Sequence, residues 1–243
     1  DPDAARAQGA ALAAASDLLD IGGESTRPGA PEVAVADEIA RTAPVIAALR
    51  AAGVTCPISI DTRKAAVAAA ALEAGAGLVN DVAALGFDPA LAPLVAAADV
   101  PVCLMHMRGT PATMQDHAVY DDVVIEVYSE LAAMVARAEA AGIARGRILV
   151  DPGIGFAKTA AQNVALIARL SVFHGLGVPV LLGASRKKFI GSIGGAEVAA
   201  DRVPGSLAVA LAGVAQGAQV IRVHDAAETR QALRLWRAVT GAD

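Results

Sequence analysis

Cysteine is rare in this chain, which excludes a disulfide-built scaffold. Cys56 and Cys103 are the two cysteines, and neither lies in a CxxC or other metal-ligand spacing. No basic segment followed by an apolar one opens the sequence, so nothing in it argues for export. We therefore expect reduced thiols and a cytoplasmic protein.

Aromatic residues and runs of positive charge are scarce as well. Aromatic side chains make up 3% of the chain, the formal net charge is −5, and no basic run is interleaved with aromatics. This composition argues against nucleic acid as a partner and requires local cations to hold any anionic ligand. The long uncharged segment 203–221 contains Pro204 and two glutamines, so we expect a helix and a buried strand there rather than a membrane span.

What the chain does contain is a repeated pattern of short apolar segments that end in polar side chains. In segment 149–158 an apolar run ends at Asp151, and a proline and two glycines then force a turn before Lys158. The same layout occurs in six other segments, at residues 21–24, 58–62, 78–81, 104–106, 182–187 and 221–225. Seven strands that each deliver polar residues at their carboxyl ends predict an α/β barrel with one site at its rim.

The length of 243 residues suits a single domain, residues 1–243. We expect strands at residues 18–22, 57–61, 78–82, 102–107, 148–151, 178–183 and 220–223. We expect helices at residues 4–16, 33–52, 64–74, 89–97, 121–141, 162–170 and 226–239, with a broken helix between residues 186 and 216. Asp1 would cap the first helix, and Pro2 would occupy its first position. Alternating strands and helices with apolar strand cores predict a parallel sheet that is buried on both faces.

The expected strand count is one short of a closed barrel, which has eight strands. We therefore expect a strand and its loop to precede Asp1 in the natural protein. An open doubly wound sheet is the rival architecture, but no GxGxxG motif opens a helix after the first strand.

Three acceptor-bearing side chains end three separate strands of the predicted barrel: Asp61, Asn80 and Asp151. Each alone could be a helix cap, but together they predict a pocket for a flat nitrogenous ring. An ionised carboxylate accepts two parallel N–H bonds, which suits an amidine-like edge. Lys187 could donate to the same ring.

Cations and hydroxyls occur at other strand ends and in two glycine-containing loops. Arg222 and His224 are two apart on one expected strand, so both would face an anion, although backbone bonding and pairing with an acid are alternatives. Loop 22–29 could close over a substrate, and loop 183–189 could bind an anion at a helix start. Phe156 could stack on a second flat substrate or fill the core. We expect Lys158 and Lys188 to be solvated or loop-stabilising, and His106 is left open.

Together the segments DIGGESTRPGA, ISIDT, LVNDV, LMHM, ILVDPGIGFAK, LLGASRKKFIG and IRVHD resemble dihydropteroate synthase, a pterin-binding TIM (β/α)8 barrel family, in order along nearly the whole chain. The resemblance implies a dihydropterin site made of Asp61, Asn80, Asp151, Lys187, Met105, Val82 and Gly183. It implies that Arg222 and His224 bind pyrophosphate. The implied p-aminobenzoate pocket consists of Ser25, Thr26, Arg27, Pro28, Gly155, Phe156, Ser185 and Arg186. The implied catalytic side chains are Lys187, Arg222, His224 and Asp61.

The activity implied is a transferase of folate biosynthesis. It would condense 6-hydroxymethyl-7,8-dihydropterin pyrophosphate with p-aminobenzoate in an SN1-like step, at a site where sulfonamides compete. The resemblance also implies Mg²⁺ as cofactor and a homodimer. The alternatives are a methyltetrahydrofolate-dependent methyltransferase, which would lack the STRPG and SRK loops, and a non-catalytic pterin-binding remnant.

One part of the family pattern has no counterpart in the printed chain. The family's first strand and loop carry an Asn that helps to bind Mg²⁺-pyrophosphate, so we expect no metal ligand within residues 1–243. We expect the printed chain to be much less active than one with that segment restored. Undiminished pyrophosphate release would contradict this expectation.

Overall fold

The protein is an α/β structure built from parallel strands and surrounding helices. The computed structural model describes residues 2–27 and 29–241, so the predictions on Asp1 and Pro28 lie outside the described residues. The strands are β1 (Leu19–Gly22), β2 (Ile58–Asp61), β3 (Leu78–Asp81), β4 (Val102–Met105), β5 (Ile148–Asp151), β6 (Leu181–Leu182) and β7 (Val220–Ile221). All seven coincide with expected strands.

The helices follow the strands in alternation, as expected. They are α1 (Pro2–Ala13), α2 (Val35–Ala51), α3 (Ala65–Glu73), α4 (Leu91–Ala98), α5 (Val123–Ala140), α6 (Ala160–Ala168), α7 (Lys188–Gly194), α8 (Val203–Ala215) and α9 (Ala226–Thr240). The expected broken helix is the pair α7 and α8. No single helix in the described part of the chain is long and apolar enough to cross a membrane, and the pair Lys188–Gly194 and Ala199–Ala215, which passes that test together, is bent by 80°.

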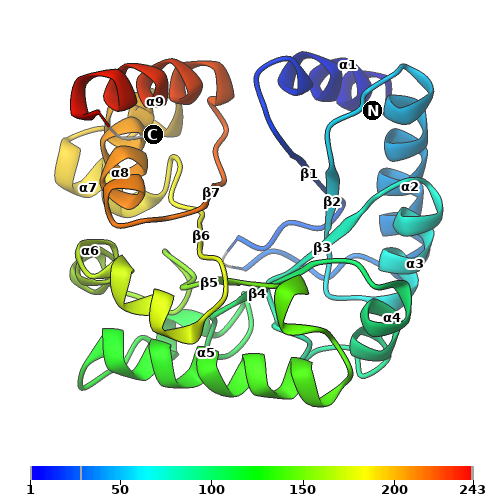
Figure 1. Cartoon of the computed structure of the whole chain (residues 1–243), viewed down its shortest axis with the longest axis horizontal. Coiled ribbons are helices and arrows are strands. Elements are labelled where there is room, and N and C mark those ends of the chain that lie inside the picture. Colours follow the sequence, from blue (N-terminus) through cyan, green and yellow to red (C-terminus); the bar gives the residue numbers. More distant parts are fainter. Residues whose placement is uncertain (1, 28, 242–243) are drawn as a thin grey trace.

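The strands are arranged around a ring in the order of the sequence. β1 to β5 pair in parallel with their neighbours, β6 pairs with β7, and a parallel bridge between Val150 and Val180 joins the two groups. Figure 1 shows the helices on the outside of this ring. Sequential order without a reversal contradicts the rival doubly wound sheet, which has a topological switch point, and supports the barrel.

The ring is open between β7 and β1, whose facing edges are unpaired within the described residues (Figure 1). Two arginines reach across this opening. The Arg222 Nε atom lies 2.6 Å from the Asp20 Oδ2 atom, and the Arg230 Nη2 atom lies 2.7 Å from the Asp17 Oδ1 atom. Side chains therefore join the first and last strand units where backbone pairing is absent.

Strand alternation separates an apolar outer layer from a polar inner one. On β2, Ile58 and Ile60 are fully buried in the apolar cluster, while Ser59 and Asp61 occupy the alternate positions. Register places Asp61 beside Asn80 on β3. Because parallel strands end at the same edge, polar residues at these positions gather at one mouth of the ring. The apolar cluster supports the expected single domain, which stays a prediction.

Several element boundaries differ from the sequence expectations. α1 ends at Ala13, three residues early, β4 ends at Met105, two residues early, and a 3₁₀ segment (Leu170–Leu176) follows α6 where none was expected. β6 and β7 are also shorter than expected, and just before β6 the Gln219 side chain accepts a hydrogen bond from the Val180 amide at 2.8 Å. β7 ends at Ile221, so Arg222 and His224 lie after it rather than on it.

Candidate active site

The inner mouth of the ring contains a carboxylate that the sequence analysis missed, Asp20 on β1. Its Oδ2 atom accepts a hydrogen bond from the Asn80 amide at 3.1 Å, and the Ser59 hydroxyl donates to its other oxygen. Leu19 and Ile21 on either side of it are apolar, so strand alternation could have indicated that Asp20 faces inward. The motif was instead interpreted from Ile21 onward.

Arg222 bridges Asp20 and Asp61. Its Nε atom lies 2.6 Å from the Asp20 carboxylate and its Nη2 atom lies 3.0 Å from the Asp61 Oδ2 atom. Burial and the charge of Asp20 together raise the pKa of Asp61 to about 7, against the opposing effect of Arg222. Two carboxylates thus share one guanidinium, which leaves acceptor capacity for an N–H-rich ligand.

Asp151 lies across the mouth, at the end of β5, and is 7% exposed. Its Oδ1 atom accepts from the Gly153 amide at 2.7 Å. A Cβ atom on Gly183 would lie 3.4 Å from the Asp151 Oδ2 atom and 3.8 Å from the Arg222 Cβ atom. Burial raises the pKa of Asp151, while the charge of Lys187 opposes the rise. Asp61, Asn80 and Asp151 therefore lie around one space, with Arg222 between them.

Lys187 enters the same space from the start of α7. Its ammonium donates to the Ile154 carbonyl and lies 4.2 Å from the centroid of the Phe156 ring. Gly155 has a φ of +83°, and a Cβ there would lie 2.9 Å from the Lys187 Cδ atom, so glycine lets the lysine pass. Burial lowers the pKa of Lys187 to about 8.

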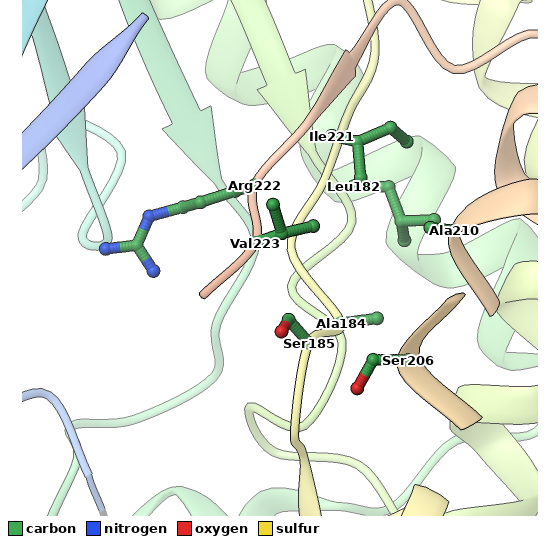
Figure 2. A pocket seen from close by; sticks show the side chains of 8 residues that line it. All are labelled: Leu182, Ala184, Ser185, Ser206, Ala210, Ile221, Arg222 and Val223. Atoms are coloured by element: carbon green, nitrogen blue, oxygen red, sulfur yellow. The ribbon is translucent and has the colours of Figure 1, made fainter. Parts of the chain in front are cut away.

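Arg222 and His224 were expected to face one anion from a single strand, but they contact different partners. The His224 Nδ1 atom lies 3.0 Å from the Ser185 Oγ atom, whereas Arg222 contacts Asp20 and Asp61. Figure 2 shows Arg222 extending away from the small cavity that Ser185 and Ser206 line. The expectation that both lie on one strand is wrong, because β7 ends at Ile221. Their proposed role with pyrophosphate stays a prediction.

The residues expected around p-aminobenzoate occupy three segments. Thr26 lines a cavity together with Asp61 and Val82. The Ser25 hydroxyl accepts from the Arg27 amide at 3.4 Å within loop 22–34. Arg186 is held by Asp225, with an Nε to Oδ2 distance of 2.9 Å. Ser25, Thr26 and Arg27 therefore belong to the β1 side of the mouth, and Ser185, Arg186 and Phe156 to the β5–β6 side.

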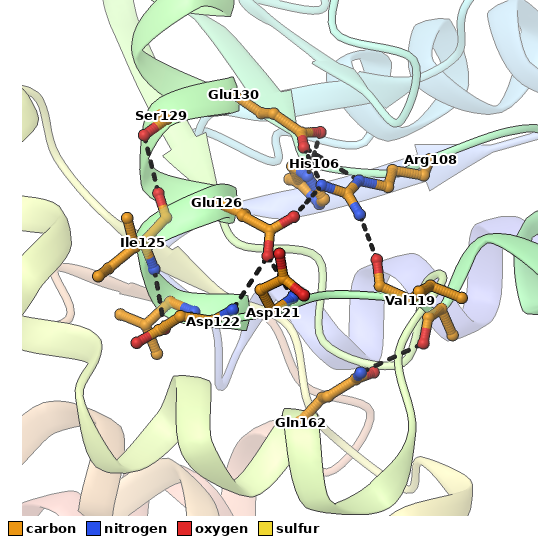
Figure 3. Close-up of polar contacts among 12 residues, drawn as sticks. His106, Arg108, Val119, Asp121, Asp122, Ile125, Glu126, Ser129, Glu130 and Gln162 are labelled. Atoms are coloured by element: carbon orange, nitrogen blue, oxygen red, sulfur yellow. Dashed lines mark hydrogen bonds and ion pairs between the residues drawn. The ribbon is translucent and has the colours of Figure 1, made fainter.

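A buried polar cluster lies beneath the loop that follows β5. The Lys158 ammonium contacts the His106 Nδ1 atom at 3.0 Å and the Phe156 carbonyl at 2.9 Å, and the His106 Nε2 atom lies 2.9 Å from the Glu130 Oε2 atom. Figure 3 shows Glu130 on α5 converging with His106 and Arg108 from the segment after β4. Met105 is buried and lies in register with Asp151. Lys158 is not solvated, because its side chain is 4% exposed, whereas Lys188 is exposed.

A family model described as "Pterin binding enzyme" matches residues 1–224. The dihydropteroate synthase of Escherichia coli (strain K12) is 43% identical over 243 residues, which cover 99% of this chain and 84% of that protein. The chain belongs to the dihydropteroate synthase family.

Solved structures of this family have the same fold. The Xanthomonas albilineans dihydropteroate synthase with 4-aminobenzoic acid superposes with a TM-score of 0.94 at 48% identity, covering 100% of this chain and 86% of that chain. The same enzyme in complex with 7,8-dihydropteroate superposes with a TM-score of 0.90 at 45% identity, covering 100% of this chain and 86% of that chain. The barrel fold, the transferase class and the family resemblance are confirmed. The methyltransferase alternative finds no support in these relatives.

The family resemblance implies a magnesium ion, which would need a group of acidic or other metal-binding side chains near the mouth of the ring. Within residues 2–27 and 29–241, no three His, Cys, Asp or Glu side chains are grouped so that they could hold a metal. Asp20 and Asp61, the carboxylates at the opening, already bond the Arg222 guanidinium. These residues do not fit a magnesium site by themselves.

Proposed function

We propose that this chain condenses 6-hydroxymethyl-7,8-dihydropterin pyrophosphate with p-aminobenzoate, using the mouth of the strand ring as its active site. The C–O bond of the pterin methylene breaks and its electron pair leaves with pyrophosphate. The lone pair of the aromatic amine then forms the C–N bond, and the amine proton passes to solvent. The products are 7,8-dihydropteroate and pyrophosphate.

The pterin ring is the substrate that the acidic inner layer suits best. Its amidine-like edge offers parallel N–H groups to the carboxylates of Asp61 and Asp151, and Asn80 supplies a further donor and acceptor. Lys187 donates to a ring carbonyl or nitrogen. Met105 and Val82 contribute apolar surface, and Gly183 leaves room beside Asp151. The electron-rich ring supports positive charge at the methylene as the leaving group departs.

Arg222 and His224 would stabilise the charge that develops on pyrophosphate. The Arg222 guanidinium bonds Asp20 and Asp61. Pterin N–H groups would replace it on Asp61, which frees the guanidinium for the phosphate oxygens. Mg²⁺ remains in the proposal only as a counter-ion of the pyrophosphate substrate.

The amine would enter between the two loops. Thr26 and Arg27, with Ser25, approach from the β1 side, and Phe156 offers a ring face to the aromatic substrate. Ser185, Arg186 and Gly155 complete the pocket inferred from the family, and the predicted role of Pro28 concerns a residue outside the described ones. A sulfonamide would compete there. The homodimer and the cytoplasmic location stay predictions, which analytical ultracentrifugation and cell fractionation would test.

The observation that carries this proposal is the gathering of Asp61, Asn80 and Asp151 around one space with Arg222 and Lys187. The test is Asp151→Asn, assayed by dihydropteroate formation and pyrophosphate release. We expect loss of about 100-fold or more in kcat/KM, because a neutral amide offers one acceptor where the carboxylate offers two. Asp99→Asn, at an exposed helix end, is the matched control and should leave the rate unchanged. Equal activity of both variants would refute the assigned role.

A further inference from the structure

A buried lysine, Lys64, lies behind the cavity that Thr26 and Asp61 share. Its ammonium contacts the Glu24 carboxylate at 2.6 Å, the Glu38 carboxylate at 2.8 Å and the Val33 carbonyl at 2.5 Å. The exposed fractions of the Lys64, Glu24 and Glu38 side chains are 4%, 9% and 1%. We call Glu24, Val33, Glu38 and Lys64 the loop-base clamp.

The loop-base clamp closes the loop that carries Ser25, Thr26 and Arg27. Glu24 stands at the start of that loop and Val33 near its end, and the Val33 amide donates to the Glu24 Oε2 atom at 2.7 Å. Lys64 bonds both of them. One carboxylate and one ammonium therefore fix the two ends of the loop to each other.

The same contacts fix the loop to the end of β2. The Thr62 hydroxyl donates to Glu38 at 2.7 Å, and the Arg63 Nε atom donates to the Glu24 Oε1 atom at 3.1 Å. Thr62 and Arg63 directly follow Asp61 in the chain. Glu24, Glu38, Thr62 and Arg63 also line the cavity that contains Thr26, Asp61 and Val82. A shift in the clamp would thus move Thr26 relative to Asp61.

We propose that Glu24 and Lys64 are positioning residues that set the distance between the aminobenzoate-binding loop and the pterin-binding end of β2. The inference rests on the function proposed above and extends it to two residues that are not among the predicted substrate contacts. A substrate group displaced by about 1 Å can lose about 100-fold in rate. A loosened loop would weaken the binding of the amine substrate and leave the contacts with the pterin in place.

The first test is Glu24→Gln, which removes the charge and keeps the shape. We expect the KM for p-aminobenzoate to rise about tenfold while the KM for the pterin pyrophosphate changes by less than about twofold. Glu32→Gln is the matched control, because Glu32 lies in the same loop but is 58% exposed and 3.6 Å from Arg63. It should change neither KM. A Glu24→Gln enzyme with an unchanged KM for p-aminobenzoate, or with both values raised equally, would overturn the inference.

A second variant and a second measurement separate positioning from folding. Lys64→Arg keeps a cation between the two carboxylates and should keep the KM for p-aminobenzoate within about threefold of the wild type. Hydrogen exchange of segment 24–33 should be faster in Glu24→Gln and near wild type in Lys64→Arg. If the wild type forms no dihydropteroate, the proposed function fails, and exchange alone still tests the clamp. Unchanged exchange in Glu24→Gln would refute it.

Discussion

Two buried lysines lie beneath the two loops of the site, and they are held in opposite ways. Lys64, below the loop after β1, contacts two carboxylates, those of Glu24 and Glu38. Lys158, below the loop after β5, contacts the His106 ring and the Phe156 carbonyl, and it forms no ion pair with a carboxylate of residues 2–27 or 29–241. Both side chains are 4% exposed.

The partners decide the charge of each lysine. Burial lowers the pKa of Lys64, but its bonds to Glu24 and Glu38 outweigh this effect and raise the pKa above its ordinary value. Burial lowers the pKa of Lys158 to about 7, and the charge of Asp151 compensates only in part. Lys64 is therefore an ammonium throughout the physiological range, whereas Lys158 exchanges its proton within it. The first loop is fixed by ion pairs, and the second by hydrogen bonds around a lysine whose charge changes near neutral pH.

The largest effect expected from this difference is on stability. Lys64→Met should lower the free energy of unfolding by about 3–5 kcal/mol, because it leaves buried carboxylates without their shared cation. Lys158→Met should cost less than about 2 kcal/mol, since it removes no ion pair and leaves the His106 Nδ1 atom and the Phe156 carbonyl without this donor. Urea denaturation at neutral pH measures both. Equal losses would show that the two lysines are held alike.

The sequence predicts the mouth of the barrel well because strand geometry is local. Asp61 and Asp151 end apolar segments, and the two-residue alternation of a strand places their side chains on the inner face without further information. Asp151 is followed by Gly153 and Gly155, whose left-handed backbone the glycine pattern indicates. The carboxyl ends of parallel strands then bring these residues together.

The sequence does not predict the two lysine clusters, because their partners lie far away along the chain. Lys64 pairs with a residue 40 positions away, and Lys158 with one 52 positions away. A lysine after a turn has the pattern of a solvated or loop-stabilising side chain. Lys158 is buried, and its bond to the Phe156 carbonyl fits the second of these expectations. Asp20 also has partners far away along the chain, because Asn80 lies on β3 and Arg222 follows β7.

A pH series sharpens the comparison, with a smaller effect. Unfolded Lys158 titrates near its ordinary pKa of 10.5 and folded Lys158 near 7. Between these values the unfolded chain holds the extra proton, so the free energy of unfolding rises with pH, by at most about 1.4 kcal/mol per pH unit. Below pH 7 both states are protonated and the cost of burying the charge is constant. Lys64 stays protonated in the folded and the unfolded state over this pH range, so it does not change how the unfolding free energy depends on pH.

The measurement is the difference in unfolding free energy between the wild type and Lys158→Met, taken at about pH 7.5 and about pH 9.5. Using the difference removes the titration of other groups. The unfolding free energy of the wild type should increase relative to that of the variant as the pH rises. Lys188→Met, which changes the exposed neighbour of Lys187, should show no such gain. A difference that stays constant for Lys158→Met would mean that the lysine keeps its charge when folded.

The smallest effect is expected where an ion pair is exposed. Arg147 and Asp99 form a pair at 2.9 Å, a distance similar to those around Lys64, but their side chains are 44% and 71% exposed. Water already solvates both charges, so Arg147→Gln should change the unfolding free energy by less than about 1 kcal/mol. Urea denaturation of the Arg147→Gln and Lys64→Met variants under the same conditions compares the two losses directly. A loss as large as that of Lys64→Met would mean that the bond itself, rather than the burial of its carboxylates, makes the loop-base clamp strong.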